Sequence, residues 1–514
     1  MGRNVRLCSI SFFSRCAFVT GEAFKLTDIL RTMELRALSI LVVIFLFCLN
    51  SCKKEDENGP PGPVINSFDP ESGSPGTAVT ILGHGFSSTS GELEVKFNGV
   101  AATVSSSNPT VIQTVIPEGA TTGPVTVSIR GATATSPEPF TVLPAVADDP
   151  SFYFGADLSY VNQILDHGGV YRDQNEVRDP YRIFADHGTD LVRLRLWHNP
   201  VWTKEIYEPD GPQLYNDLFD VERAIAASKA QGMKVLLDFH YSDFWADPGR
   251  QEIPAAWLEI KDINVLRDSV YNYTFHVMSY LDDRGLMPEF VQIGNETNCG
   301  MMYEYDEEPV AGFPALNVCD QQWSNFKTVV NSAIKAVRDV SGGSAIKTKI
   351  VLHVADPVNV TWWFDNITSG TGASDFDIIG FSYYPIWHRD VSVDQLSDRI
   401  AEFRTVYDRD VMILETAYPW TTEGNDSNTN IFGGQAPTAG YPYTPQGQLD
   451  MMKKITQEVI DGGGIGVVYW EPAWITSGMR DFWSTGSSWE NAALFDFDGN
   501  VGQGMSFMTA SYDR

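Results

Sequence analysis

The sequence predicts an α/β fold, a (β/α)8 TIM barrel preceded by a small N-terminal immunoglobulin-like β-sandwich. Two observations predict it. From about residue 150 to residue 514, apolar runs alternate with amphipathic helical stretches, which is typical of parallel strands buried on both faces. Across residues 63–143, short segments of alternating apolar and polar residues are separated by Gly, Pro, Ser and Asn, which is typical of a sandwich. A chain of 514 residues is also too long for one ordinary domain.

The composition excludes several classes of partner. The chain has 36 Lys and Arg against 66 Asp and Glu, so its formal net charge is −30. Nucleic acid and anionic membrane surfaces repel so acidic a chain, and we expect neither as a substrate. A neutral polysaccharide carries no such penalty. The 13 Trp and 20 Tyr residues suit stacking on sugar rings, although they would also suit a large core.

The first 51 residues are predicted to be absent from the mature protein. Ala37–Leu49 is an apolar run preceded by Arg36, too short to span a bilayer comfortably but suited to the centre of a signal peptide. Such a peptide would begin at Met33, and residues 1–32 would then come from an upstream start codon. The alternative is a real cytoplasmic extension.

Residues 49–52, Leu-Asn-Ser-Cys, resemble the lipobox of bacterial lipoproteins. The resemblance implies that the thiol of Cys52 is lipidated and that Cys52 becomes the mature N-terminus. The membrane would then be a partner only through this anchor, and the protein would lie in the cell envelope, on the outer membrane. The charged stretch at residues 53–57 is similar to those that accompany surface export in some Gram-negative lipoproteins.

Residues 52–62 are predicted to be a linker, since they end in the stiff sequence Gly-Pro-Pro-Gly. The predicted sandwich at 63–143 resembles an IPT/TIG immunoglobulin-like domain. Four segments carry that resemblance: 65–70, 72–76, 81–86 and 95–99. This domain contains no catalytic set of residues. It is therefore interpreted as a spacer, with glycan binding as the alternative.

Eight apolar runs are predicted to be the barrel strands. They cover residues 152–158, 190–197, 234–240, 290–295, 349–355, 377–384, 411–415 and 465–470. Amphipathic helices are expected in the segments between them, among them Val221–Gln231, Trp323–Val340, Val393–Tyr407 and Gln446–Asp461. Eight such units over about 360 residues fit a barrel with long loops.

Active sites on this fold lie at the carboxyl ends of the strands, and here those ends are polar or aromatic. Glu296 follows the fourth run and Glu415 closes the seventh. Strands four and seven lie on roughly opposite sides of a barrel, so both carboxyl groups can point into one cleft. Retaining cleavage of a glycosidic bond needs such a pair about 5 Å apart. The alternative is that each Glu pairs with an Arg and serves stability alone.

The ordered motifs along this part of the chain resemble glycoside hydrolase family 53, the endo-β-1,4-galactanases, within a clan of retaining (β/α)8 enzymes. The motifs are Leu194–Trp197, Asp238–Pro248, Gln292–Glu296, Ser382–His388 and Tyr469–Trp474. The resemblance extends from about Phe152 to Asn500. It implies a retaining endo-hydrolase of β-1,4-galactosidic bonds in galactan or arabinogalactan side chains of pectin.

The resemblance also implies roles for individual residues. Glu296 would be the acid/base and Glu415 the nucleophile, with Asn295 bonded to the sugar 2-hydroxyl. Tyr384, or its neighbour Tyr383, would hold the nucleophile, and Arg195 would keep Glu415 ionised. His240 and Trp470 would line the −1 subsite. The candidate sugar platforms and rim contacts, any of which could instead be scaffold, are Trp245, Asp247, Trp387 and Trp474.

Two loops depart from the family pattern. The loop Glu304–Asp320, which follows Glu296, ends near Cys319. Cys299 and Cys319 could form a disulfide or remain free thiols. The loop Thr421–Gly440 corresponds to one that binds calcium in some bacterial members. Its oxygen donors, together with one from a later loop, are Asp426, Asn428, Asn430 and Glu490. Such a calcium would be structural, because a retaining glycosidase needs no cofactor for catalysis.

Two rival functions stay open. The first is a retaining β-glycanase of the same clan that acts on mannan or xylan. The second is a surface glycan-binding lipoprotein whose barrel has lost catalysis. Such a protein would be expected to lack one of the two carboxylates, and this chain has both.

Overall fold

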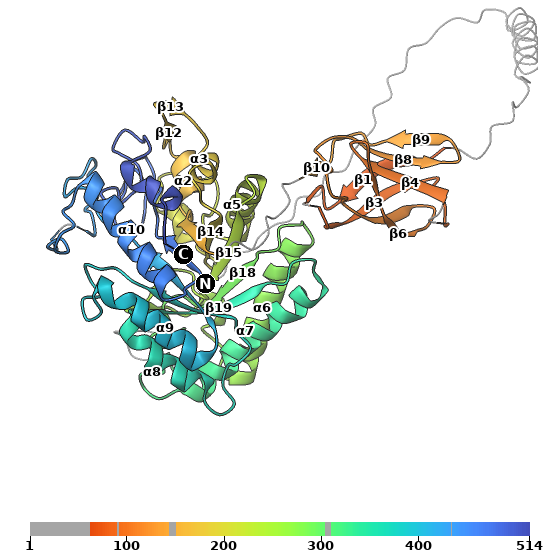
Figure 1. Ribbon diagram of the computed structural model, residues 1–514. Coiled ribbons are helices and arrows are strands. Elements are labelled where there is room, and N and C mark those ends of the chain that lie inside the picture. Colours follow the sequence, from red (N-terminus) through yellow and green to blue (C-terminus); the bar gives the residue numbers. More distant parts are fainter. Residues whose placement is uncertain are drawn as a thin grey trace, which may run out of the picture. The chain divides into compact units, whose positions relative to one another are not determined.

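The structure is a computed structural model that describes residues 62–73, 75–89, 92–142, 151–303, 310–432 and 434–513 (Figure 1). The predicted signal peptide, the lipidation site Cys52 and most of the predicted linker lie outside the described residues. Within the described ranges, none of the helices combines the length and the apolar character needed to cross a membrane.

The predicted β-sandwich is confirmed and consists of two four-stranded antiparallel sheets. One sheet has the order β1 (Val64–Asp69), β3 (Ala78–His84), β7 (Val111–Val115), β6 (Val104–Ser107). The other has the order β5 (Val100–Ala102), β4 (Leu93–Phe97), β8 (Val125–Ile129), β9 (Ala132–Thr135). A small parallel pair joins β2 (Ser72–Gly73) to β10 (Thr141–Val142).

Alternation along these strands places one side chain in two in the core of the sandwich. Val79, Ile81, Val95 and Phe97 have no exposed surface. The tight turn between β4 and β5 is made by Asn98 and Gly99, both at positive φ (42° and 91°). Asn-Gly is the pair that such a two-residue hairpin favours, because it tolerates this backbone conformation.

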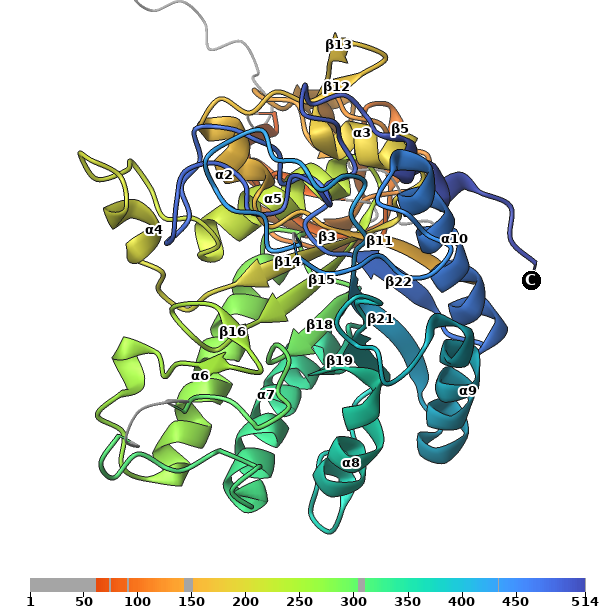
Figure 2. The same cartoon turned by 90° about the vertical axis from the view of Figure 1, so that its left-hand side faces the viewer.

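The predicted barrel is also confirmed, as a closed sheet of eight parallel strands (Figure 2). The strands, in order around the barrel, are β11 (Tyr153–Asp157), β14 (Leu191–Leu196), β15 (Lys234–Phe239), β18 (Phe290–Ile293), β19 (Lys349–Ala355), β20 (Ile378–Ser382), β21 (Asp410–Thr416) and β22 (Gly466–Tyr469). Spatial order follows sequence order, as in other (β/α)8 barrels. Each of the eight predicted runs contains or overlaps one of these strands.

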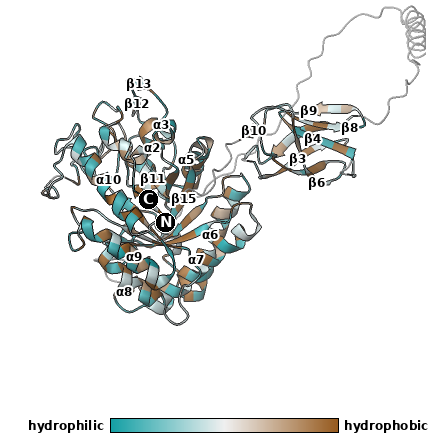
Figure 3. Ribbon diagram, viewed as in Figure 1, coloured by the Kyte–Doolittle hydropathy of each residue, from teal (hydrophilic) through white to brown (hydrophobic). Residues whose placement is uncertain are grey.

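Helices cover the outside of the barrel, except for α4 (Trp202–Glu205), which lies in the connection between β14 and α5 (Figure 2). The covering helices are α2 (Val161–Asp166), α3 (Pro180–Asp186), α5 (Leu218–Ala230), α6 (Ile263–Asp282), α7 (Trp323–Gly343), α8 (Pro357–Thr368), α9 (Leu396–Tyr407) and α10 (Pro445–Asp461). Their apolar sides face the strands and their polar sides face solvent (Figure 3). Several begin at residues whose side chains cap the first turn. Asp217 caps α5 and Thr444 caps α10, where a proline occupies the first turn.

The barrel interior changes character along its axis. Every second residue of a strand points inward, and the lower inward layer is apolar, with Leu191, Leu236, Val351 and Ile378 among its members. The next layer towards the carboxyl ends is polar. Its fully buried members include Arg193, Asp238, Gln292 and His353. A buried polar layer therefore lies directly above a buried apolar layer inside the barrel, on the side of the carboxyl ends of the strands.

Candidate active site

Glu296 and Glu415 meet at the carboxyl end of the barrel, as predicted. Glu415 lies within β21, and Glu296 lies three residues beyond the end of β18. Oxygen atoms of the two carboxyl groups and a ring nitrogen of His353 all lie within 4.8 Å of one another. This separation matches the spacing of about 5 Å used by glycosidases that retain configuration, and leaves no room for the extra water of an inverting enzyme.

The backbone before Glu296 turns sharply to bring its side chain inward. Gly294 has φ 77° and Glu296 itself has φ 44°. A Cβ at Gly294 would lie 2.6 Å from Cγ2 of Thr297, so a larger residue does not fit here. Left-handed backbone at a residue other than Gly is uncommon and often marks a functional site.

The carboxylate of Glu415 is held from two sides. Arg193 Nη1 lies 2.9 Å from Oε1, and the Tyr384 hydroxyl donates a 3.0 Å hydrogen bond to Oε2. Tyr384, rather than Tyr383, is therefore the tyrosine at this carboxylate, since the Tyr383 hydroxyl donates to the Val391 carbonyl.

The prediction that Arg195 would keep Glu415 ionised is wrong, because Arg193 occupies that position. Both arginines point inward from β14, but Arg195 lies one layer nearer the rim. Its Nη1 pairs with Glu471 at 3.1 Å. Three aromatic rings surround its guanidinium, with centroids 4.1–4.7 Å away: Tyr160, Trp197 and Trp245. Arg195 is thus a buried support beneath Trp245, outside the wall of the cleft.

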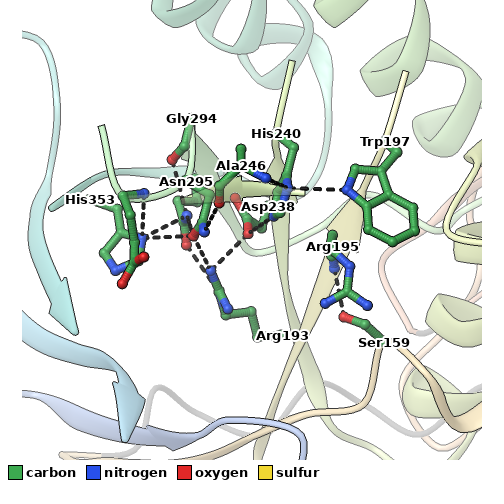
Figure 4. Close-up of polar contacts among 12 residues, drawn as sticks. Ser159, Arg193, Arg195, Trp197, Asp238, His240, Ala246, Gly294, Asn295 and His353 are labelled. Carbon is green, nitrogen blue, oxygen red and sulfur yellow. Dashed lines mark hydrogen bonds and ion pairs between the residues drawn. The ribbon is translucent and has the colours of Figure 1, made fainter. Parts of the chain in front are cut away.

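Arg193 is the centre of a buried network that sequence reasoning missed (Figure 4). Its guanidinium contacts Asp157 at 2.8 Å, Asp238 at 2.7 Å and Asn295 Oδ1 at 2.7 Å. Asn295 in turn donates to the Ala246 carbonyl at 2.7 Å, which fixes the direction of its amide. The signal was the two-residue period of β14, which places Arg193 on the inner face.

His240 also departs from its predicted place at the −1 subsite, and lies beneath the cleft floor with 2% of its surface exposed. Its Nε2 lies 3.1 Å from Asp238. Its Nδ1 accepts from the indole N–H of Trp197 and the backbone N–H of Ala246, both at 3.2 Å (Figure 4). Because both ring nitrogens are occupied, His240 orients its neighbours instead of facing a ligand.

The electrostatic surroundings of the two glutamates differ. Burial raises the pKa of Glu415 to about 7, while the adjacent Arg193 opposes the shift. Burial, and then the negative charge of Glu415, raise the pKa of Glu296 well above its usual range. As pH rises, Glu415 therefore loses its proton first and Glu296 keeps its proton to higher pH. One protonated and one ionised carboxyl group is the state in which two such groups act as acid and nucleophile.

A cleft of about 720 Å³ opens above the pair. Its walls include predicted site residues: Trp245, Asp247, Asn295, Glu296, Tyr384, Trp387, Glu415, Trp470 and Trp474. Sequence reasoning did not single out Trp483 and Trp489, which also line it. Trp387 and Trp483 are 39% and 58% exposed, so solvent reaches part of both side chains. Aromatic walls of this kind suit sugar rings.

Cys299 and Cys319 form a disulfide, with an S–S distance of 2.02 Å. The sequence left this pairing and free thiols equally open. The bond ties together the two ends of the loop that follows Glu296.

Of the four candidate calcium ligands, three lie together. A Cβ at Gly424 would lie 3.0 Å from Glu490 Oε1 and 3.1 Å from Asn430 Nδ2, so these two side chains are neighbours. Burial raises the pKa of Glu490, and the nearby charge of Asp426 raises it further. Asn430 Oδ1 is buried and has no hydrogen-bond partner among the residues that the structure describes. Asn428 faces the cleft instead, where its amide donates to Asp481 at 3.2 Å.

Comparisons with known proteins follow the same division of the chain. Residues 153–508 match the model of glycosyl hydrolase family 53, and residues 63–142 match that of the IPT/TIG domain. The arabinogalactan endo-β-1,4-galactanase of Cellvibrio japonicus (strain Ueda107) is 45% identical over 351 residues, which cover 68% of this chain and 88% of the relative.

Two solved structures are similar over the barrel. The GH53 catalytic domain of Ignisphaera aggregans has a TM-score of 0.61 at 31% identity, and the match covers 72% of this chain and 99% of that one. A structure described as one of two fungal β-1,4-galactanases has a TM-score of 0.58 at 27% identity, and the match covers 70% of this chain and 99% of that one.

Proposed function

The chain belongs to glycosyl hydrolase family 53, and we propose that it is a retaining endo-hydrolase of β-1,4-galactosidic bonds in galactan and arabinogalactan. The observation that carries this proposal is the pair of carboxyl groups, Glu296 and Glu415, within 4.8 Å on the floor of an open aromatic cleft. The galactanases among the relatives supply the substrate class.

In the first step, an oxygen of Glu415 attacks the anomeric carbon while the bond from that carbon to the glycosidic oxygen breaks. Glu296 gives its proton to the departing oxygen, which leaves as the hydroxyl of the shortened chain. The ion pair with Arg193 at 2.9 Å keeps the Glu415 carboxylate charged until it attacks. The hydroxyl of Tyr384 directs its second oxygen.

In the second step, water attacks the anomeric carbon of the galactosyl ester and the bond to Glu415 breaks. Glu296, now ionised, accepts a proton from that water. Two inversions at one carbon return the β configuration. The amide of Asn295, the residue before Glu296, is fixed by Arg193 and Ala246. We assign this amide to the sugar 2-hydroxyl.

Digestion of linear β-1,4-galactan tests the proposal. We expect mixtures of oligosaccharides from the start of the reaction, since a cleft open at the rim accepts the middle of a chain. Mannan and xylan, assayed in parallel, address the rival glycanases. Binding of galactan with no new reducing ends would support the non-catalytic alternative and overturn this one.

Anchoring in the cell envelope is part of the proposal. The lipobox-like sequence before Cys52 supports a lipidated protein on the outer membrane, open to the surface. The IPT/TIG domain would then serve as a spacer between the anchor and the barrel. Incorporation of a labelled fatty acid by the full chain, and its absence from the Cys52→Ala variant, is the expected result. Equal labelling of both would exclude this anchor.

A structural calcium is proposed for the loop that follows β21. Asp426, Asn430 and Glu490 would hold it. Asn430 Oδ1, which accepts no hydrogen bond from any residue that the structure describes, suits a hard cation. Both Glu490 oxygens already accept hydrogen bonds, from Asn425 N–H and from the Thr476 hydroxyl, so these would be exchanged on binding. Metal analysis of purified protein is expected to find about one calcium per chain, and a chelator to lower Tm.

A further inference from the structure

One side chain at the acid/base has no role in the mechanism above. Ser382 ends β20, the strand between those that carry His353 and Glu415. Its backbone pairs with Ala355 on one side and with Glu415 on the other. Its side chain is fully buried, and its hydroxyl donates a 2.5 Å hydrogen bond to Glu296 Oε1.

The other side of Ser382 faces His353. Its Oγ lies 3.0 Å from His353 Nε2. The contacts of the other ring nitrogen, Nδ1, decide whether Ser382 Oγ or His353 Nε2 is the donor. The backbone N–H of Glu296 donates to His353 Nδ1 at 3.2 Å, so Nδ1 carries no proton. A neutral imidazole carries its single proton on one nitrogen, which here must be Nε2.

A competing contact supports this assignment. Asn295 Oδ1 lies 2.9 Å from His353 Nδ1 and would need a proton there. That oxygen already accepts from Arg193 at 2.7 Å and from the Gln292 amide at 3.0 Å. An amide oxygen has two lone pairs, and both are used. Burial and the charge of Arg193 also hold the pKa of His353 well below its usual range, so the ring stays neutral.

The contacts therefore form a donor chain that runs in one direction. His353 Nε2–H donates to Ser382 Oγ, and the Ser382 hydroxyl is left to donate to Glu296. Because the Ser382 oxygen accepts from the imidazole, its proton points at the carboxyl group. The remaining charged or titratable neighbours of Glu296 come from other elements: Glu415 on β21, Asp247 on β16 (Ala246–Asp247), Arg193 on β14 and Tyr384 after β20.

We propose that Ser382, oriented by His353, is a positioning residue that holds the Glu296 carboxyl by one hydrogen bond and sets how readily that carboxyl gives up its proton. The inference rests on the proposed function, in which Glu296 must be an acid in one step and a base in the next. A donor aimed at Oε1 favours the ionised form and opposes both burial and the charge of Glu415. It also keeps the carboxyl group in one orientation between the two steps.

The test is the pH profile of kcat/KM on linear β-1,4-galactan, whose basic limb reports loss of the last proton from the Glu296–Glu415 pair. In Ser382→Ala, we expect that limb to move to higher pH by about one unit, or roughly tenfold in proton affinity. Ser382→Thr, which keeps the hydroxyl, should return the limb toward that of the wild type. A purely structural role would lower activity without moving the limb.

Thr416→Val is the matched control. Thr416 is also fully buried at a strand end, but its hydroxyl has no hydrogen-bond partner in the described part of the chain. Its basic limb should coincide with that of the wild type. Should Ser382→Ala fail to fold, Ser382→Cys keeps a weaker donor at the same place and should give a smaller shift in the same direction.

The outcomes separate this inference from the proposed function. A wild type active on galactan with an unshifted limb in Ser382→Ala would overturn the positioning role and leave the galactanase proposal standing. A wild type inactive on galactan would overturn the galactanase proposal itself. A basic limb that moves to lower pH would also contradict the donor chain, since it would mean that the hydroxyl favours the protonated form.

Discussion

The two sides of the cleft floor hold the same chemical group in different surroundings. On the side of β21, Glu415 lies 2.9 Å from a guanidinium and accepts a hydrogen bond from Tyr384. On the side of β18, Glu296 contacts the neutral hydroxyl of Ser382 and faces the charge of Glu415. The difference teaches that neighbours, more than residue type, divide the roles of nucleophile and acid between two glutamates.

Removing the nucleophile should have the largest effect. Without Glu415 the galactosyl ester cannot form, so Glu415→Ala should lose on the order of 10⁴-fold or more in kcat, as loss of the nucleophile does in other hydrolases. Azide fits the vacated space and should restore some turnover of substrates with good leaving groups. The product, identified by NMR, should have the inverted configuration. A retained product would assign the nucleophile elsewhere.

Glu296→Ala should be less severe and should depend on the substrate. General acid–base catalysis contributes about 10²–10⁴-fold, so activity on galactan should fall within that range. An aryl galactoside that leaves without a proton should still form the ester at nearly the normal rate, seen as a burst of released phenol. Here azide should give the retained product. If both variants gave the same azide anomer, the contrast between the two sides would be wrong.

The two arginines of β14 test whether a neighbouring cation distinguishes Glu415 from Glu296. Arg193→Met removes the cation from Glu415 and should lower kcat by about 10²-fold, the scale of one preorganised electrostatic contact. It should also move the acidic limb of the pH profile to higher pH, because the carboxylate loses the charge that keeps its pKa down.

Arg195→Met is the matched control for that variant. It lies on the same strand and is equally buried, but pairs with Glu471 and not with Glu415. Its acidic limb should stay where it is in the wild type. Loss of its contacts with the aromatic rings should instead reduce the stability measured in urea. It should also raise KM, because Trp245 would lose the guanidinium beneath it and shift. A shift of the acidic limb in Arg195→Met alone would restore the role predicted for it from sequence.

These arginines show what sequence could and could not predict. The fold was accessible because strands and helices have different periods, and because eight apolar runs alternated with helical ones. Glu296 and Glu415 were accessible because carboxylates at strand ends are costly without a function. Which arginine contacts Glu415 depends on its position along the barrel axis. Arg193 and Arg195 both point inward from β14 but lie in successive layers, which the sequence does not distinguish. Ser382 was visible as a polar strand end, but its partner depends on which side chains converge from three strands.

A third buried carboxyl group provides the smallest expected effect on turnover. Glu471 lies beneath the cleft wall, and burial raises its pKa to about 8 despite the adjacent Arg195. A carboxyl group whose pKa is raised by folding contributes its full stabilisation at pH values below its pKa in the unfolded chain, which is about 4.3. That contribution falls steadily as pH rises from there, and it is gone once pH has passed the folded pKa of about 8. Glu471→Gln removes the titration but keeps the shape and an acceptor for Arg195.

The free energy of unfolding of Glu471→Gln, relative to the wild type, should therefore grow with pH by up to about 1.4 kcal/mol per unit between pH 5 and pH 8. Urea denaturation at three or four pH values measures it, and kcat should stay within about threefold of the wild type at each. A difference independent of pH would mean that Glu471 is ionised throughout. In that case Arg195 would hold its carboxylate as Arg193 holds Glu415, and proximity of a guanidinium alone would not distinguish the nucleophile. The nucleophile would then be marked by its opening into the cleft beside a second carboxyl group.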